Sequence, residues 1–269
     1  VEFLREVNLG KKVNVGSKVA IVGGGNSAID AARTAVRLGA KDVTIIYRRE
    51  RKDMPAWENE IVAAEHEGVK IVYLAAPTKL IGKNGKLVGV ECQRMRLGEF
   101  DRSGRRKPVP IPGSEFTLAI DTIVPAISQN TDATFIPAGS DVAINKWGGI
   151  QTTGKAKNKT TAENVFIAGD AASGPATVVE AIAMGHRTAD DVDSFIRAQN
   201  NEPAYRRPPE EEIEIPFEVD EEVVETPRGK MPELKKSERR ITFKEVELGY
   251  SKKTAHKESC RCLRCDAEL

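Results

Sequence analysis

Three consecutive glycines at positions 23–25 separate an apolar run from a stretch with helical spacing, and they constrain the fold more than any other feature. The apolar run, residues 18–22, is typical of a buried strand. Residues 26–39 are rich in alanine, with apolar residues at intervals near 3.6 and Gly39 at the end, which predicts a helix. A second apolar run at 42–49 completes a predicted strand–turn–helix–strand unit.

The turn reads Gly23-x-Gly25-x-x-Ala28, which in this context is typical of a dinucleotide-binding site. Gly23 permits the tight turn, Gly25 lets a pyrophosphate approach the backbone, and Ala28 lets the helix pack close to the strand. The free N–H groups at the helix start attract phosphate, and Asn26 and Ser27 can add side-chain donors. A tight turn without a ligand is the alternative.

The end of the second predicted strand distinguishes between cofactors. An NAD site places an acidic residue there to hold the ribose 2′-hydroxyl. Here Arg48 and Arg49 occupy that place and Glu50 follows them. Because guanidinium groups pair with phosphate in a bidentate manner, the sequence predicts an NADP(H) site in which both arginines bind the 2′-phosphate. A solvated basic strand end is the alternative.

The following residues are consistent with the same domain. The apolar spacing predicts a helix over 54–70 and a third strand over 71–76, and the Asn84-Gly85 pair predicts a hairpin turn between two further strands. Residues 100–116 are polar and rich in turn formers, so we expect an exposed loop there. A final apolar strand is expected over 116–127.

Composition excludes some classes of function. A net charge of +1 and an aromatic content of 5% argue against a nucleic-acid-binding surface. No apolar run approaches the roughly 20 residues of a membrane helix. The first residues lack the order of regions found in a signal peptide, so we expect a cytoplasmic protein without nucleic-acid or membrane partners.

A second informative stretch covers residues 164–196. An apolar strand is expected to run into Gly169 and Asp170, and a loop of small residues then leads to a long helix starting near Pro175 to Thr177. An aspartate at the carboxyl end of a strand can accept hydrogen bonds from ribityl hydroxyls. The helix start can stabilise negative charge on a reduced flavin.

Four segments together resemble the pyridine-nucleotide module of the glutamate synthase small-subunit family: "VAIVGGGNSAIDAARTAVRLGA", "VTIIYRRERKDMPA", "ENVFIAGDAASGPATVVEAIAMGHRTA" and "ESCRCLRCD". Members of that family are FAD-containing NADPH oxidoreductases related to the flavoproteins with two dinucleotide-binding domains. The resemblance implies an α/β fold, with a Rossmann-like three-layer NADP(H)-binding domain inserted in a partial FAD-binding domain. The implied segments are a linker from an upstream half of the FAD domain (1–16), the NADP(H) domain (17–125), the second half of the FAD domain (126–198) and a charged C-terminal strap (199–269).

The resemblance also implies residues that bind FAD, namely Gln129, Gly169, Asp170, Thr177 and Val178. Ser128 stands before Gln129 where the family usually has glycine. The family's own FAD-binding G-x-G-x-x-G has no counterpart in this sequence. We therefore expect the FAD site to be incomplete here, and an upstream region or another subunit to complete it; loss of flavin is a further alternative.

The C-terminal region carries blocks of charge and a cysteine cluster. Residues 210–225 hold nine acids and no base, whereas 228–264 hold 12 bases and five acids. Such blocks favour a strap that pairs with itself or with a partner, or else a solvated tail. Cys260, Cys262 and Cys265 are one ligand short of a closed metal site, and His256 or a partner's cysteine could supply the fourth. An iron–sulfur cluster, a zinc site and free thiols all stay open, although "RCLRCD" is similar to the family's iron–sulfur ligand segments.

Taken together, the residues and the resemblance predict an electron-entry module. Hydride would pass between NADP(H) and FAD, and electrons would continue to iron–sulfur clusters, in a complex like glutamate synthase or a ferredoxin/NADP transhydrogenase. The alternatives are a non-catalytic nucleotide-binding subunit used for assembly or regulation, and a plain NADP(H)-binding dehydrogenase domain. Cys92, in a strand-like run, is expected to be a buried small hydrophobe.

Overall fold

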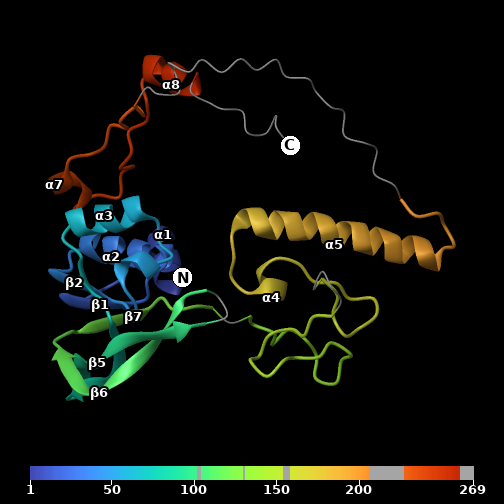
Figure 1. Ribbon diagram of the computed structural model, residues 1–269, viewed down its shortest axis with the longest axis horizontal. Coiled ribbons are helices and arrows are strands. Elements are labelled where there is room, and N and C mark those ends of the chain that lie inside the picture. The colour runs from blue at the N-terminus through green and yellow to red at the C-terminus, as the bar shows by residue number, and fades with distance from the viewer. Residues whose placement is uncertain (102–103, 130, 154–157, 206–226, 261–269) are drawn as a thin grey trace. The chain divides into compact units, whose positions relative to one another are not determined.

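The computed structural model describes residues 1–101, 104–129, 131–153, 158–205 and 227–260. The chain divides into two compact units (Figure 1). The first unit combines residues 1–127 with 215–269, and the second consists of residues 128–214. Each unit is described by itself.

A four-stranded parallel sheet forms the centre of the first unit, in the order β3-β2-β1-β7. Its strands are β1 (Lys18–Val22), β2 (Asp42–Ile46), β3 (Lys70–Val72) and β7 (Thr122–Pro125). The chain runs from β1 to β2 and β3 on one side and then returns to β7 on the other side of β1. Such a reversal creates a crevice at the carboxyl ends of the central strands, where α/β sheets bind their ligands.

Helices cover one face of this sheet, as Figure 1 shows. They are α1 (Glu2–Asn8), α2 (Asn26–Arg37) and α3 (Glu58–His66). The inner side of α2 is mostly alanine, and these small side chains let the helix pack against Ile21 and Ile45 in a fully buried core. The predicted strand–turn–helix–strand unit is confirmed.

A three-stranded antiparallel sheet forms the third layer on the other side of the parallel sheet (Figure 1). Its strands are β4 (Ala75–Lys83), β5 (Lys86–Phe100) and β6 (Arg106–Leu118). Ala20 and Ile46 of the parallel sheet contact Val90 and Cys92 of this layer in a second apolar cluster. Cys92 is fully buried, as expected, and burial raises the pKa of its thiol to about 11.

Three local predictions for this unit were wrong. The expected loop over 100–116 is largely strand β6, whose polar and proline-rich residues pair with β5 along a ribbon that is exposed for much of its length. The expected strand over 71–76 belongs to two sheets, because Leu74 adopts a φ of 51° and turns the chain from β3 into β4. The helix expected over 54–70 is shorter, spanning Glu58–His66.

A buried ion network joins α2 to α3. One oxygen of Glu67, a fully buried residue, accepts hydrogen bonds from Arg33 at 2.8 Å and from Arg37 at 3.1 Å. Arg33 also pairs with Glu60 on α3. Because a buried carboxylate without partners is costly inside a protein, these arginines compensate for the burial of Glu67.

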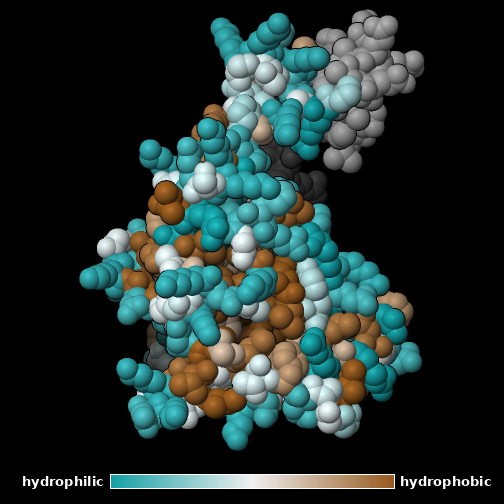
Figure 2. All heavy atoms as spheres, turned by 90° about the vertical axis from the view of Figure 1, so that its left-hand side faces the viewer, coloured by the Kyte–Doolittle hydropathy of each residue, from teal (hydrophilic) through white to brown (hydrophobic). Residues whose placement is uncertain are grey.

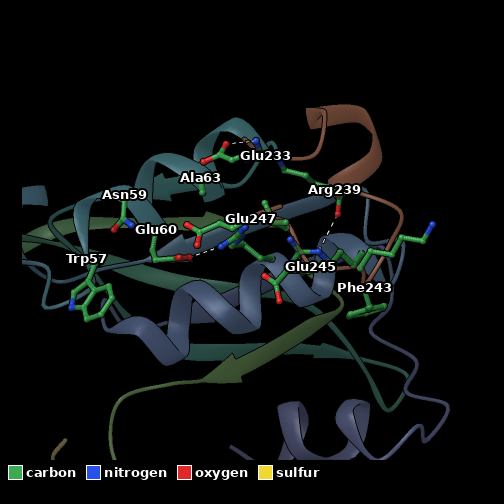
Figure 3. A pocket seen from close by; sticks show the side chains of 13 residues that line it. Trp57, Asn59, Glu60, Ala63, Glu233, Arg239, Phe243, Glu245 and Glu247 are labelled. Atoms are coloured by element: carbon green, nitrogen blue, oxygen red, sulfur yellow. Dashed lines mark hydrogen bonds and ion pairs between the residues drawn. The ribbon is translucent and has the colours of Figure 1, made fainter. Parts of the chain in front are cut away.

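The C-terminal strap is described over residues 227–260, and its residues 233–247 lie against α2 and α3. Its two short helices are α7 (Lys236–Arg239) and α8 (Lys252–Ser259), and the side chains around α8 are almost all hydrophilic (Figure 2). The strap pairs with itself through an antiparallel bridge between Glu233 and Glu247. Arg37 of α2 donates a hydrogen bond to the carbonyl of Arg239 at 3.0 Å. A pocket of about 480 Å³ lies between strap and helices, with Trp57 at one end and Phe243 at the other (Figure 3).

The second unit has little regular structure among its described residues. Its helices are α4 (Asp170–Ser173) and α5 (Val178–Gln199). The strand expected before Gly169 is not formed as a regular strand. Phe166 makes only an isolated antiparallel bridge with Lys159. In the described parts of both units, no helix has the length and apolar character that crossing a membrane requires.

Candidate nucleotide-binding site

The glycine turn follows β1, and Ala126 and Tyr47 pack closely against its first two residues. Gly23 has a φ of +146° and donates its N–H to the carbonyl of Ile46 at 3.1 Å. A Cβ atom on Gly23 would lie 2.3 Å from the carbonyl oxygen of Ala126, and one on Gly24 would lie 2.4 Å from the ring of Tyr47. The first two positions therefore require glycine for packing. The G-x-G-x-x-A pattern assigns no role to Gly24, although Tyr47 directly after β2 indicates a bulky neighbour for the turn.

Gly25 faces open space and begins α2. Its φ of −89° and ψ of 176° are accessible to any residue, and the nearest atom to a Cβ placed there is Pro55 Cγ, 3.8 Å away. No side chain caps the helix among the described residues, and its first turn holds no acid. The first N–H groups of α2 are therefore left for a ligand, at the positive end of the helix dipole.

The segment that precedes α3 lines this entrance. Ala56 donates its N–H to the carbonyl of Gly24 at 3.1 Å, and Trp57 donates its N–H to Oδ1 of Asn26 at 3.1 Å. Asn26 thus holds the segment with its oxygen, which leaves its Nδ2 group as the donor for a ligand. Ser27 is exposed on the first turn, and Ala28 is fully buried against the core.

The two arginines after β2 lie in different surroundings. Arg48 is exposed, and within the described residues its side chain makes no ion pair. Arg49 is only 4% exposed. Its Nη2 lies 2.9 Å from Oδ2 of Asp101, and its Nε donates to the carbonyl of Arg106 at 2.8 Å. The structure therefore presents one guanidinium of the predicted pair to solvent and uses the other inside the protein.

The residues expected at a flavin lie in the second unit. Gln129 is exposed and follows Ser128, whose φ of 155° belongs to the region that favours glycine. Gly169 precedes α4, and Oδ1 of Asp170 accepts a hydrogen bond from the N–H of Ala176 at 3.3 Å.

Thr177 and Val178 begin α5. Oγ1 of Thr177 accepts the N–H of Glu180 at 3.3 Å, and the N–H of Thr177 donates to the Glu180 carboxylate at 2.9 Å. The backbone N–H and the hydroxyl of Thr177 both donate to the Glu180 carboxylate, and these two hydrogen bonds lower the pKa of Glu180. Val178 and Val179 are 76% and 75% exposed. The helix start is therefore capped by the chain's own side chains, and an uncovered apolar surface lies beside it.

The cysteine cluster lies mostly beyond the described residues. Cys260 follows α8 and is exposed, while Cys262 and Cys265 fall outside the described part. Within that part, no group of three or more His, Cys, Asp or Glu side chains could hold a metal ion.

Known proteins match this chain over most of its length. The sequence model described as pyridine nucleotide-disulphide oxidoreductase matches residues 1–185. The NADPH-Fe(3+) oxidoreductase subunit beta of Geobacter sulfurreducens is 39% identical over 98% of this chain and 44% of that protein. The NADP(+)-dependent formate dehydrogenase subunit beta of Moorella thermoacetica is 41% identical over 98% and 38%, respectively. The glutamate synthase [NADPH] small chain of Azospirillum brasilense is 36% identical over 70% and 39%.

Solved structures agree on the fold. FprA of Mycobacterium tuberculosis, in complex with NADPH, has a TM-score of 0.56 at 16% identity, covering 72% of this chain and 56% of FprA. Thioredoxin reductase of T. acidophilum has a TM-score of 0.51 at 21% identity, covering 73% and 56%. The chain spans less than half the length of the curated relatives named above. The resemblance expected from the four sequence segments is confirmed, and the chain belongs to the pyridine nucleotide-disulphide oxidoreductase family.

Proposed function

We propose that this chain is the electron-entry part of a larger oxidoreductase, in which hydride passes between NADP(H) and FAD and electrons continue to iron–sulfur centres. The observation that carries the proposal is the uncapped start of α2. It opens beside a glycine turn at the carboxyl ends of parallel strands, and the exposed Arg48 follows the neighbouring strand.

The residues at this entrance fit a dinucleotide. The open side of Gly25 admits a pyrophosphate, and the first N–H groups of α2 can donate to its oxygens. Asn26 adds its Nδ2 group, because its oxygen already accepts from Trp57. Arg48 supplies the charge for a 2′-phosphate, which favours NADP(H) over NAD(H).

The second unit fits part of a flavin site. Bound FAD would supply the hydride-transfer chemistry, so the protein needs only to bind and orient the two cofactors. The exposed carboxylate of Asp170 can accept hydrogen bonds from ribityl hydroxyls, with Gln129, Gly169, Thr177 and Val178 beside the flavin. The uncovered surface of Val178 and Val179 suits a flavin ring or further polypeptide, and we propose that another region or subunit completes the site.

The relatives guide the choice of complex. Two proteins named subunit beta, one of an NADPH-Fe(3+) oxidoreductase and one of an NADP(+)-dependent formate dehydrogenase, match 98% of this chain, whereas the glutamate synthase small chain matches 70%. We therefore propose a multi-subunit complex with an iron–sulfur electron acceptor, and Cys260, Cys262 and Cys265 as ligands of a cluster. Iron–sulfur ligation by cysteine thiolates suits a reducing compartment, so we also propose a cytoplasmic location.

Cofactor titration tests this proposal. The 269-residue chain is titrated with NADPH and NADH, and then mixed with FAD and reduced anaerobically by NADPH while absorbance near 450 nm is followed. We expect NADPH to bind more tightly than NADH and Arg48→Glu to remove the preference, with Lys79→Glu on β4 as the matched control. Absence of NADPH binding would contradict the proposal. Binding that never leads to flavin reduction, even with the completing subunit present, would favour the non-catalytic nucleotide-binding subunit.

A further inference from the structure

Arg49 ties two distant segments together. Its side chain leaves the end of β2 and is buried between Asp101 and the carbonyl of Arg106, on either side of the β5–β6 connection. A guanidinium that is already hydrogen-bonded to a carboxylate and a carbonyl must give up both contacts before it can bind a phosphate. Arg49 is therefore better placed to hold the hairpin than to hold a ligand.

Asp101 links Arg105, just before β6, to the side chain of Arg49. One carboxylate oxygen of Asp101 accepts from Arg49, and the other accepts the backbone N–H of Arg105 at 3.3 Å. The backbone N–H of Asp101 in turn donates to the carbonyl of Arg105 at 2.7 Å. The same carboxylate thus fixes the position of Arg105 relative to the end of β2.

Arg105 is held near the end of β2, because Asp101 binds both its backbone N–H and the guanidinium of Arg49. The ring of Tyr47 packs against Gly24, and its hydroxyl donates to the carbonyl of Asp53 at 2.6 Å. Burial raises the pKa of Tyr47, and the nearby positive charges of Arg49 and Arg105 act against that rise. The exposed Arg105 therefore brings a second positive charge, besides that of Arg48, to the carboxyl end of β2.

We propose that Arg105, delivered by the β5–β6 hairpin, contacts the 2′-phosphate together with Arg48, and that Arg49 is a positioning residue acting through Asp101. The proposal rests on the proposed function, because it specifies how the same site recognises NADP(H). It also replaces the expected pair of adjacent arginines with a pair drawn from two different layers of the fold. The phosphate would then sit between the end of β2 and the start of β6.

Ligand pairs that differ only in the 2′-phosphate test this arrangement. The affinities of the chain for NADPH and NADH, and for 2′,5′-ADP and 5′-AMP, are measured for the wild type and for Arg105→Gln, Arg105→Lys and Asp101→Asn. Arg96→Gln, an exposed arginine on β5, is the matched control. We expect Arg105→Gln to weaken binding of NADPH and 2′,5′-ADP about tenfold, to leave NADH and 5′-AMP unchanged, and to be partly rescued by lysine.

Asp101→Asn separates the two roles of Arg49. If Arg49 positions the hairpin, releasing it from Asp101 lowers the preference for NADPH. If Arg49 is itself the phosphate ligand, the same change frees its guanidinium, so the preference is kept or rises, and that result would overturn the inference. Unchanged discrimination in Arg105→Gln would overturn it as well. Far-ultraviolet circular dichroism and the Tm establish that each variant is folded.

The same measurements distinguish this inference from the proposed function. A wild-type chain that does not prefer NADPH over NADH would contradict the assignment of an NADP(H) site, and Arg105 would then have no phosphate to bind. A wild-type preference that persists in both Arg105→Gln and Asp101→Asn would contradict only the role of the hairpin.

Discussion

The helices α2 and α5 both follow turns rich in small residues, yet they begin in opposite ways. The start of α2 has no side-chain cap and no acid in its first turn. The start of α5 is closed by a reciprocal pair of hydrogen bonds between Thr177 and Glu180. The difference favours the start of α2 as the anion site, because the start of α5 already has the Glu180 carboxylate beside it and the N–H groups of Thr177 and Glu180 are hydrogen-bonded.

The two helices also differ in how they are held. Arg33 and Arg37 of α2 share the buried Glu67, whereas Arg197 of α5 pairs with Asp193 one turn away on the surface. An open helix start gains nothing from a cap, so its stability must come from the rest of the helix. In α2 that support comes from the buried network and from the alanine face.

The largest expected effect is on protein stability, when the arginine ion pairs of α2 and α5 are removed. Arg33→Met would leave Glu67 with one fewer counter-charge in the core, and we expect it to lower the free energy of unfolding by about 3–5 kcal/mol. The matched change on α5, Arg197→Met, should cost far less because its pair with Asp193 is exposed. Chemical denaturation measures both. Equal effects of the two variants would contradict the contrast between the helices.

The next effect is on the glycine turn. Gly25→Ala should keep the fold, since its Cβ meets nothing closer than 3.8 Å, but its methyl group would occupy the space of a pyrophosphate. We expect NADPH affinity to fall at least about tenfold, or about 1.4 kcal/mol. Gly23→Ala is the informative companion, because its Cβ would meet a carbonyl oxygen at 2.3 Å and should destabilise the protein itself. Isothermal titration and thermal unfolding separate the two outcomes, and tight NADPH binding by Gly25→Ala would place the ligand elsewhere.

A smaller change makes α2 resemble α5. Ser27→Glu adds an acid to the exposed first turn, which should stabilise the helix by about 0.3–1 kcal/mol while repelling the phosphates. We therefore expect the Tm to rise or stay level as NADPH affinity falls. Ser27→Gln is the neutral control and should change neither quantity appreciably. A parallel loss of stability and affinity would point to misfolding rather than to charge.

The smallest effect is the pH dependence of the α5 cap. The pKa of Glu180 is lowered by its bonds to Thr177, so its contribution to stability is complete above the ordinary value of 4.5 and is lost as pH falls through the lowered value. Hydrogen exchange at the start of α5 should be faster in Glu180→Gln than in the wild type near neutral pH, and the difference should vanish in acid. NADPH binding should be the same in both proteins. A change in NADPH affinity would link the two helix starts directly.

The sequence predicts the glycine turn and the start of α2 well, because the residues that determine them lie close together in the chain. Gly23, Gly25 and Ala28 act within a single turn, so their spacing alone identifies the strand, the turn and the helix. The α5 cap is also encoded locally, since Thr177 and Glu180 form the Thr-x-x-Glu pattern of a capping box.

Other features depend on contacts that no local pattern encodes. Arg49 looks like a ligand in the sequence because its partner Asp101 lies 52 residues further on. The sequence of strand β6 is typical of a loop, because prolines and charges are tolerated on an exposed ribbon, where few side chains must be apolar. The docking of the strap on α2 joins residues 202 positions apart, which composition cannot reveal.

That last contact has a consequence for how the protein is made. The surface of α2 and α3 leaves the ribosome early, yet the strap that covers part of it follows only after about 160 further residues, or about 8–32 s at usual rates of elongation. During that interval the part of α2 and α3 that the strap later contacts is exposed on the nascent chain. Because the strap emerges so much later than the helices it contacts, its docking on α2 is a late step in the folding of the first unit.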